Sequence, residues 1–194
     1  MAANPQSDEL HGIPMTEKAF ERLISTETPY RYELVDGIIY DMTGSSPKHG
    51  MIAGSIFNLI YNHLGQKSPC KVFQEQYVAI PGKPPVVPDA VVTCDRADWD
   101  EDKRLKPFKI RSPRIVIEVL SPSTEKYNRT EKFARYQRCF SLEVYILAHQ
   151  NEPYVEVYRH ATGWKQECFS AGQTIKLGQI GLELPIDLIY DGIL

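Results

Sequence analysis

The sequence has few cysteines and no cysteine motif that would bind a metal. Among its 194 residues it has four cysteines, far apart, and neither a C-x-x-C pair nor a close Cys/His cluster: Cys70, Cys94, Cys139 and Cys168. A structural zinc site is therefore not expected. Isolated thiols are typical of reduced cytosolic proteins, so we expect four free thiols and a cytoplasmic location.

Long hydrophobic runs are also missing. No stretch approaches the roughly 20 apolar residues that a membrane helix needs, and we expect no membrane contact. The beginning, MAANPQSDELHG, is polar and lacks the apolar region of a signal peptide. No G-x-S-x-G motif surrounds Ser121 or Ser123, which favours turn roles over nucleophilic ones for these two serines.

The composition predicts one folded domain. Hydrophobic residues make up 42% of the chain, with 12 Gly and 14 Pro, which is enough for a core and argues against global disorder. We expect a flexible tail over residues 1–12 and a single domain over residues 13–194. The net charge is only −3, but residues 103–138 carry eleven Lys and Arg against three Glu, a local charge of +8. This segment predicts either a basic binding face or a solvated loop and helix.

The spacing of apolar residues predicts a mixed α/β or α+β fold, with a central mixed sheet flanked by helices. Asp36 and Gly37 form a turn signal between two alternating runs, which indicates an N-terminal hairpin. Thr16 is a possible N-cap of the first helix, Asn128 and Glu131 resemble a capping box of a later helix, and Phe140 is expected to pack inward with that helix. The predicted elements, in order, are a helix (14–25), the hairpin (31–42), a helix (48–64), strands (72–80, 86–94 and 114–120), a helix (129–139), a strand (141–148) and a C-terminal β-meander (154–188).

Two of the predicted buried strands each contain one carboxylate. VVPDAVV contains Asp89, and RIVIEVL contains Glu118. A carboxylate among Val and Ile is costly unless a positive charge offsets it, and Mg²⁺ or Mn²⁺ takes such oxygen ligands, often with only one or two protein carboxylates. The carbonyl of Val119 offers a further oxygen. If the two strands adjoin and the acids share a face, the pair predicts a divalent-cation site; the alternatives are an Asp89 paired with a buried Arg and a Glu118 that caps the next helix.

The motifs PD at 88–89, YELVDG, HG at 49–50 and EVLSPST…EK…Y resemble the PD-(D/E)xK nuclease superfamily and, within it, a large bacterial family of restriction-endonuclease-like proteins. The resemblance extends over about residues 15–188. It implies a restriction-endonuclease-like core with Asp89 and Glu118 as catalytic metal ligands. The superfamily's lysine, two residues after the Glu, is replaced here by Leu120, and the resemblance nominates Lys132 on the following helix; Lys126 is the rival.

Further candidates surround this core. The family's YELVDG motif suggests Glu33 as a third catalytic acid, although it can equally be an ordinary hairpin residue. His49 begins the second helix and can contact phosphate, or it can be a satisfied surface residue. Gln74 and Gln76 alternate along one strand, so they share a face that can line the cleft. Lys126, Arg129 and Arg135 complete the expected contacts with nucleic acid.

The sequence therefore supports two functions of different classes. The first is a Mg²⁺- or Mn²⁺-dependent endonuclease that hydrolyses phosphodiester bonds, with DNA as the expected partner and a homodimer as the expected assembly, because cutting two strands takes two sites. The second is a non-catalytic module that binds nucleic acid or protein and retains the nuclease fold, which Leu120 in the lysine position favours. The same site on another phosphate ester would look no different in sequence.

Overall fold

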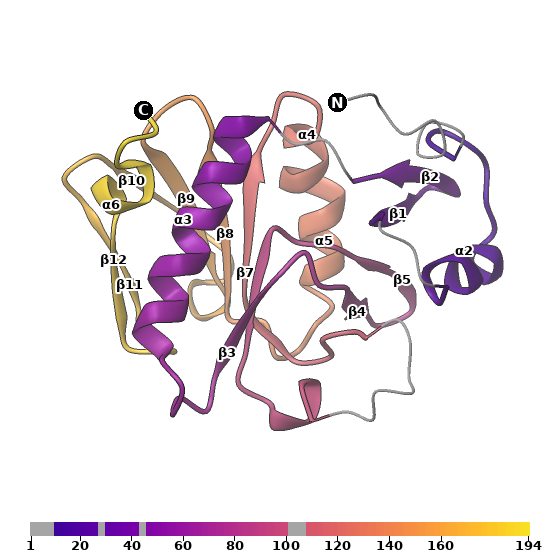
Figure 1. The fold of residues 1–194 in the computed structure, drawn as a ribbon, viewed down its shortest axis with the longest axis horizontal. Helices are drawn as coiled ribbons and strands as arrows, with labels where there is room; N and C mark the ends of the chain where they lie inside the picture. Colours follow the sequence, from indigo (N-terminus) through magenta and orange to yellow (C-terminus); the bar gives the residue numbers. More distant parts are fainter. Residues whose placement is uncertain (1–9, 27–29, 43–45, 101–107) are drawn as a thin grey trace.

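A computed structural model describes residues 10–26, 30–42, 46–100 and 108–194. Its main element is a six-stranded sheet in the order β10-β9-β8-β7-β6-β3 (Figure 1). Only β7 and β8 run parallel; the other neighbours are antiparallel. The strands are β3 (Lys71–Gln74), β6 (Ala90–Thr93), β7 (Pro113–Leu120), β8 (Val144–His149), β9 (Tyr154–Arg159) and β10 (Gln166–Ser170).

Helices cover both faces of this sheet. On one face, α3 (Pro47–Leu64) packs Ile52, Ile56 and Ile60 on Ile115, Ile117 and their neighbours. The hairpin of β11 (Thr174–Leu177) and β12 (Leu182–Pro185), followed by α6 (Ile186–Tyr190), completes that layer. On the other face lie α4 (Glu125–Tyr127), a π-helical turn η2 (Asn128–Lys132) and α5 (Phe133–Tyr136). The predicted mixed sheet flanked by helices is confirmed.

The N-terminal unit is a small separate layer. It contains α2 (Glu17–Ile24), capped by Thr16 as predicted, and the hairpin of β1 (Tyr32–Val35) and β2 (Ile38–Asp41). Asp36 and Gly37 both have positive φ, as their hairpin turn requires. Figure 1 shows this unit (indigo) on the opposite side of the molecule from the β11–β12 hairpin (yellow). The backbone N–H of Gly12 donates to Ile39 O (2.8 Å), so residues of the expected tail already contact the hairpin.

Two predicted boundaries are wrong around residues 72–86. The expected strand 72–80 divides into β3 and β4 (Val78–Ile80), because the chain turns at Glu75, which has φ 47°. The expected PGKPP loop instead forms β5 (Lys83–Val86), which pairs with β4 in a separate two-stranded sheet. Prolines are tolerated there because an edge strand leaves its N–H positions without ladder partners. Gln74 and Gln76 therefore do not share a strand face.

The expectation of four free thiols is wrong. Lys71 pairs with Thr93, so Cys70 and Cys94 stand opposite each other at the end of the β3–β6 ladder, and they form a disulfide with their Cα atoms 3.9 Å apart. Cys139 and Cys168 are free. Because stable disulfides are rare in cytosolic proteins, the thiol argument for a cytoplasmic location no longer holds. Separately, no helix in the described parts of the chain has both the length and the apolar character to cross a membrane.

Thiol counting tests the disulfide. Protein purified without reductant and then denatured should show two reactive thiols with a chromogenic disulfide reagent, and four after reduction. The Cys70→Ala variant should show three without reductant, because Cys94 loses its partner. Four reactive thiols in the unreduced wild type would contradict the pairing.

Candidate active site

Asp89 and Glu118 occupy adjoining strand ends. Asp89 lies just before β6, and the pairing of Ala90 with Ile117, extended by one residue, places Asp89 opposite Glu118 on β7. Directly opposed residues of an antiparallel pair point to the same face. The backbone N–H of Val119 also donates to Asp89 Oδ2 (2.6 Å). The two acids are therefore close enough for the Asp89 carboxylate to raise the pKa of Glu118.

The beginning of α3 meets Asp89. Ser46 caps this helix by accepting the His49 N–H (3.2 Å), and His49 Nε2 then lies 3.4 Å from Asp89 Oδ2. Burial raises the pKa of Asp89, while His49 and the Val119 N–H lower it. Both of these contacts fall on Oδ2, so Asp89 is fixed in place by one of its two oxygens.

Glu118 is buried on the face that α5 covers. Its Oε1 atom accepts hydrogen bonds from Lys132 Nζ and from the Tyr136 hydroxyl, each at 2.9 Å. Burial raises the pKa of Glu118 to about 8; the Lys132 ammonium opposes the rise, and the carboxylates of Asp89 and Glu33 add to it. Within the described residues, the contacts of Glu118 thus also fall on a single oxygen.

Lys132 lies at the centre of the site and is 1% exposed. Its ammonium contacts Val87 O at 2.9 Å, Glu118 Oε1 at 2.9 Å and Glu33 Oε1 at 3.0 Å. An ammonium has three N–H donors, so these three oxygens satisfy it. Burial lowers the pKa of Lys132, but the two carboxylates outweigh burial and raise it above its ordinary value.

The helix that carries Lys132 differs from the predicted one. It begins at Glu125 and continues through η2 to Tyr136, so Asn128 lies inside it and is not a cap. Lys132 is accordingly the last residue of the π-helical turn and not part of a first turn. The Asn128 Oδ1 atom is buried and has no hydrogen-bond partner in the described structure. Isolated π-helical turns of this kind frequently occur at functional sites.

Glu33 comes from the N-terminal hairpin and is fully buried. Its Oε1 atom accepts the Val87 N–H (2.7 Å) and contacts Lys132, and its Oε2 atom accepts the Tyr127 hydroxyl (2.9 Å). The structure therefore brings the expected third acid to the site. The usual alternation of buried and exposed residues along a strand could not predict the burial of Glu33, because Tyr32, Glu33 and Leu34 are all buried.

The expected nucleic-acid contacts divide into exposed and internal side chains. Lys126 is exposed, and Gln74 is exposed at the end of β3, opposite Ala90 and close to Asp89. Arg129 pairs with Glu125 and Glu156 (2.9 and 2.5 Å). Its role as a phosphate contact is not supported by this internal pairing.

The expected contact of Arg135 with nucleic acid is wrong. Its side chain is 8% exposed, donates to Leu34 O (2.9 Å) and pairs with Glu131. It is therefore a structural link between the helix and the hairpin and not a surface contact for nucleic acid. The predicted inward packing of Phe140 is also wrong, since that ring is fully exposed.

The basic segment does not form one unpaired basic face. Lys103, Arg104 and Lys106 lie outside the described residues. Of the other members, several are paired with acids: Lys109 with Glu21, Arg114 with Glu143, Arg129 with Glu156, Lys132 with Glu33 and Glu118, and Arg135 with Glu131. Four acids from outside the segment thus neutralise part of the local excess: Glu21, Glu33, Glu143 and Glu156.

Sequence reasoning missed three contributors. Tyr127 holds Glu33, the Val87 backbone contacts both Glu33 and Lys132, and Glu75 lies near enough to Asp89 to raise its pKa. None of these has a local motif. Only the PD dipeptide directly after Val87 gave an indirect signal.

The donor set fits a divalent cation that keeps several waters. In the described parts of the chain, no three or more His, Cys, Asp or Glu side chains form a metal-binding group. Mg²⁺, however, often takes only one or two protein carboxylates. Asp89 and Glu118 lie opposite each other, each is held by one oxygen, and two buried acids, Glu33 and Glu118, contact the ammonium of Lys132. This excess of negative charge favours a cation.

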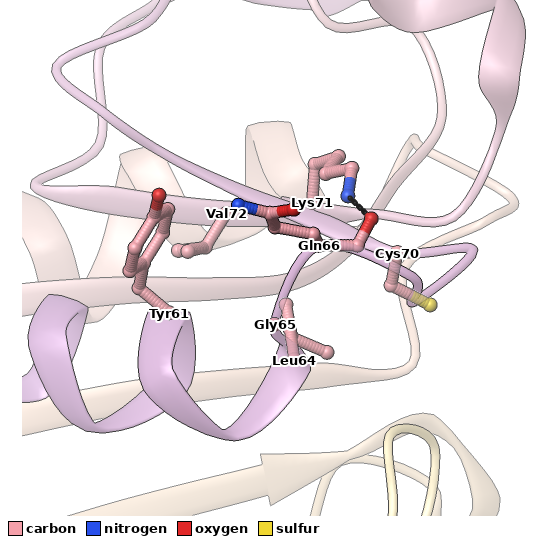
Figure 2. A pocket seen from close by; sticks show the side chains of 7 residues that line it. All are labelled: Tyr61, Leu64, Gly65, Gln66, Cys70, Lys71 and Val72. Carbon is pink, nitrogen blue, oxygen red and sulfur yellow. Dashed lines mark hydrogen bonds between the residues drawn. The ribbon is translucent and has the colours of Figure 1, made fainter.

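A separate pocket lies at the other end of α3. Its volume is about 280 Å³, and Figure 2 shows its lining: Tyr61, Leu64, Gly65, Gln66, Cys70, Lys71 and Val72. Lys71 Nζ donates to Gln66 O there (3.0 Å). Since α3 has 18 residues, its two ends are roughly 27 Å apart, and this pocket is not part of the acid site.

Known proteins are similar to this chain in sequence and in fold. An "Uncharacterized protein" of Synechocystis sp. is 32% identical over 167 residues, which are 84% of this chain and 85% of that protein. The crystal structure of "a putative nuclease belonging to DUF820" from Anabaena variabilis superposes with a TM-score of 0.73 at 22% identity, covering 93% of this chain and all of the other, and supports the fold. The Uma2 family model, described as "Putative restriction endonuclease", matches residues 18–187, and the chain belongs to this family.

Proposed function

We propose that the protein is a divalent-metal-dependent endonuclease that hydrolyses phosphodiester bonds in DNA, with Mg²⁺ or Mn²⁺ as its cofactor. One observation carries this proposal. Two buried carboxylates, Glu118 and Glu33, contact the ammonium of Lys132, and the partly exposed Asp89 lies opposite Glu118 at the adjoining strand end. A fold alone does not decide function, but this arrangement of charges matches the chemistry of phosphoryl transfer.

Three oxygens are the proposed metal ligands. Asp89 and Glu118 each have one oxygen held by donors and offer the other, Oδ1 and Oε2. The third is the carbonyl of Val119. Its N–H faces Asp89, so its C=O also faces β6, where the extended register places Pro88 opposite. Proline has no N–H to donate, so this neighbour leaves the carbonyl available. A cation bound there would supply Lewis-acid activation and a water nucleophile.

The protein's own groups then orient the reaction. Lys132 is the proposed source of positive charge beside the transferred phosphate, where an ammonium in a water-poor site stabilises the developing negative charge. His49 and the Val119 N–H fix the orientation of Asp89. Lys126 and Gln74, both exposed, are the proposed contacts for the nucleic-acid backbone.

The proposed oligomeric state and cellular location are both argued from DNA as the substrate. Cutting both strands of a duplex takes two sites, which favours a homodimer. A cytoplasmic site of action is proposed from DNA as the substrate alone, since the Cys70–Cys94 disulfide does not favour it. The apolar C-terminal segment does not argue for the dimer, because Ile186, Ile189 and Tyr190 are buried in the core.

Plasmid cleavage tests the proposal. Wild type with Mg²⁺ or Mn²⁺ should nick or linearise plasmid DNA, and Asp89→Asn and Glu118→Gln should each reduce the rate at least about a hundredfold. Glu183→Gln is the matched control, since that carboxylate is 70% exposed and pairs only loosely with Lys176 (3.9 Å). Unchanged cleavage in both site variants would show that the assignment is wrong.

A non-catalytic binding module is the second candidate, because all three N–H groups of Lys132 are occupied within the protein. Calorimetric titration with Mn²⁺ separates the two functions. Binding that disappears in Glu118→Gln supports the enzyme, whereas no heat at millimolar Mn²⁺ from a folded protein supports the module.

A further inference from the structure

Glu33, Val87 and Lys132 form a closed ring of contacts. Glu33 Oε1 accepts the Val87 N–H at 2.7 Å, Val87 O accepts from Lys132 Nζ at 2.9 Å, and Lys132 Nζ returns to Glu33 Oε1 at 3.0 Å. All three groups come from different elements: the N-terminal hairpin, the segment between β5 and β6, and the helical turn η2. Two of the three acceptors of the ammonium, Val87 O and Glu33 Oε1, therefore do not depend on Glu118.

The second oxygen of Glu33 is also engaged. Tyr127, on the same helix as Lys132, donates its hydroxyl to Glu33 Oε2 at 2.9 Å. Glu33 is 0% exposed, whereas the side chain of Asp89 is 19% exposed. With both oxygens bonded and no exposed surface, Glu33 is poorly suited to bind a hydrated cation, and its contacts are directed at the lysine.

We propose that Glu33 is a positioning residue that holds Lys132 for the reaction. A cation bound through Glu118 Oε2 would weaken the bond that Oε1 accepts from Lys132; the ammonium would then keep Val87 O and Glu33 as acceptors, and its third N–H would be available to the phosphate. This inference rests on the proposed function for its catalytic part, while the anchoring of the ammonium is independent of any activity. The N-terminal hairpin, which carries Glu33, then contributes to the active site.

A purely structural role for Glu33 would be to dock the hairpin. Tyr77 provides the matched comparison, because its hydroxyl bonds both backbone groups of Tyr32, the residue before Glu33, at 3.2 Å each. Tyr77→Phe removes these docking bonds and leaves the contacts of Lys132 intact. Effects that appear in Glu33→Gln but not in Tyr77→Phe belong to the lysine and not to docking.

The experiment measures first the rate at which the Lys132 ammonium exchanges hydrogen with water and then the kinetics of plasmid cleavage. In ¹⁵N-labelled protein, the Lys132 side-chain signal, assigned with Lys132→Met, should be protected from water exchange. Glu33→Gln should raise its exchange rate at least about tenfold, and Tyr77→Phe should leave it within about twofold. In plasmid cleavage, Glu33→Gln should lower kcat about ten- to a hundredfold, with KM and the Mn²⁺ dissociation constant unchanged within about twofold.

Each outcome decides a different point. An unchanged exchange rate in Glu33→Gln overturns the anchoring, whether or not the protein cleaves DNA. An equal loss of kcat in Tyr77→Phe would show that docking alone matters, and a loss of Mn²⁺ binding in Glu33→Gln would make Glu33 a ligand. If wild type cleaves nothing, the proposed function fails, and the exchange measurement still tests the anchoring.

Discussion

Replacing Lys132 with methionine should destabilise the protein by about 3–5 kcal/mol and abolish cleavage. The ammonium is 1% exposed and pairs with Glu33 and Glu118, which are 0% and 3% exposed. Removing one partner of a buried ion pair leaves uncompensated charge in a medium that solvates it poorly, and the typical cost is of this size. Urea denaturation at neutral pH measures the loss, and plasmid cleavage measures the activity.

Two comparisons make this prediction specific. Lys126→Met, at an exposed position on the same helical segment, should change stability by less than about 0.5 kcal/mol. Adding Glu33→Gln to Lys132→Met should cost less than the sum of the single changes, by about 1–3 kcal/mol, because the two groups interact directly. If Lys126→Met, and not Lys132→Met, loses cleavage, Lys126 is the motif lysine.

Local patterns predicted the elements whose cause is local. The Asp36–Gly37 turn, the Thr16 cap and the buried strand around Glu118 lie where the sequence placed them. In each case, one residue type has a strong backbone preference or a clear hydrophobic run. The mixed sheet followed from the order of these elements, since a strand, a helix and a strand in sequence favour a parallel pair such as β7 and β8.

The errors arose where tertiary contacts outweigh local preference. Glu75 adopts a positive φ, which is uncommon for this residue type, and no pattern marks the resulting break between β3 and β4. Asn128 looked like a cap, but the helix begins earlier, at Glu125. Cys70 and Cys94 are 24 residues apart in sequence and become neighbours only through the β3–β6 register.

The residues of the candidate site likewise divide into those that local sequence marks and those that only tertiary contacts bring together. Asp89 and Glu118 stood out because a carboxylate in a hydrophobic run is costly. Lys132 and Glu33 were suggested by the resemblance to a family, since nothing in the local sequence states that a hairpin acid and a helix lysine meet. Their meeting depends on how the N-terminal unit packs, through residues such as Val87, against the rest of the protein.

A second buried acid holds the same helix three residues before Lys132. Glu156 is 2% exposed and lies in the same row across the sheet as Glu118, with Leu147 between them. Its carboxylate accepts hydrogen bonds from Arg129 (2.5 Å) and from other donors: His149 (2.8 Å), Tyr158 (2.7 Å) and Gln166 (2.7 Å). Arg129 and Lys132 thus fasten the helix to two acids of one sheet face.

This arrangement predicts a loss of stability in acid. Burial alone would raise the pKa of Glu156, but the bonds from Arg129, His149 and Tyr158 outweigh it and lower the pKa from 4.5 to about 2. A carboxyl with a depressed folded-state pKa stabilises the protein above its unfolded pKa, and this stabilisation is lost as the pH falls from 4.5 through 2. At about 1.4 kcal/mol per pKa unit, the contribution at pH 7 is about 3 kcal/mol.

Glu156→Gln should therefore lower the free energy of unfolding by about 3 kcal/mol at pH 7, and the difference from wild type should shrink below pH 4.5. Urea denaturation of both proteins at several pH values between 3 and 7 measures it, with Glu183→Gln as the exposed control. A difference that stays constant over this range would mean that the Glu156 proton is bound equally in the folded and unfolded states. In that case shape and packing, and not the charge of Glu156, would hold Arg129 and its helix on the sheet.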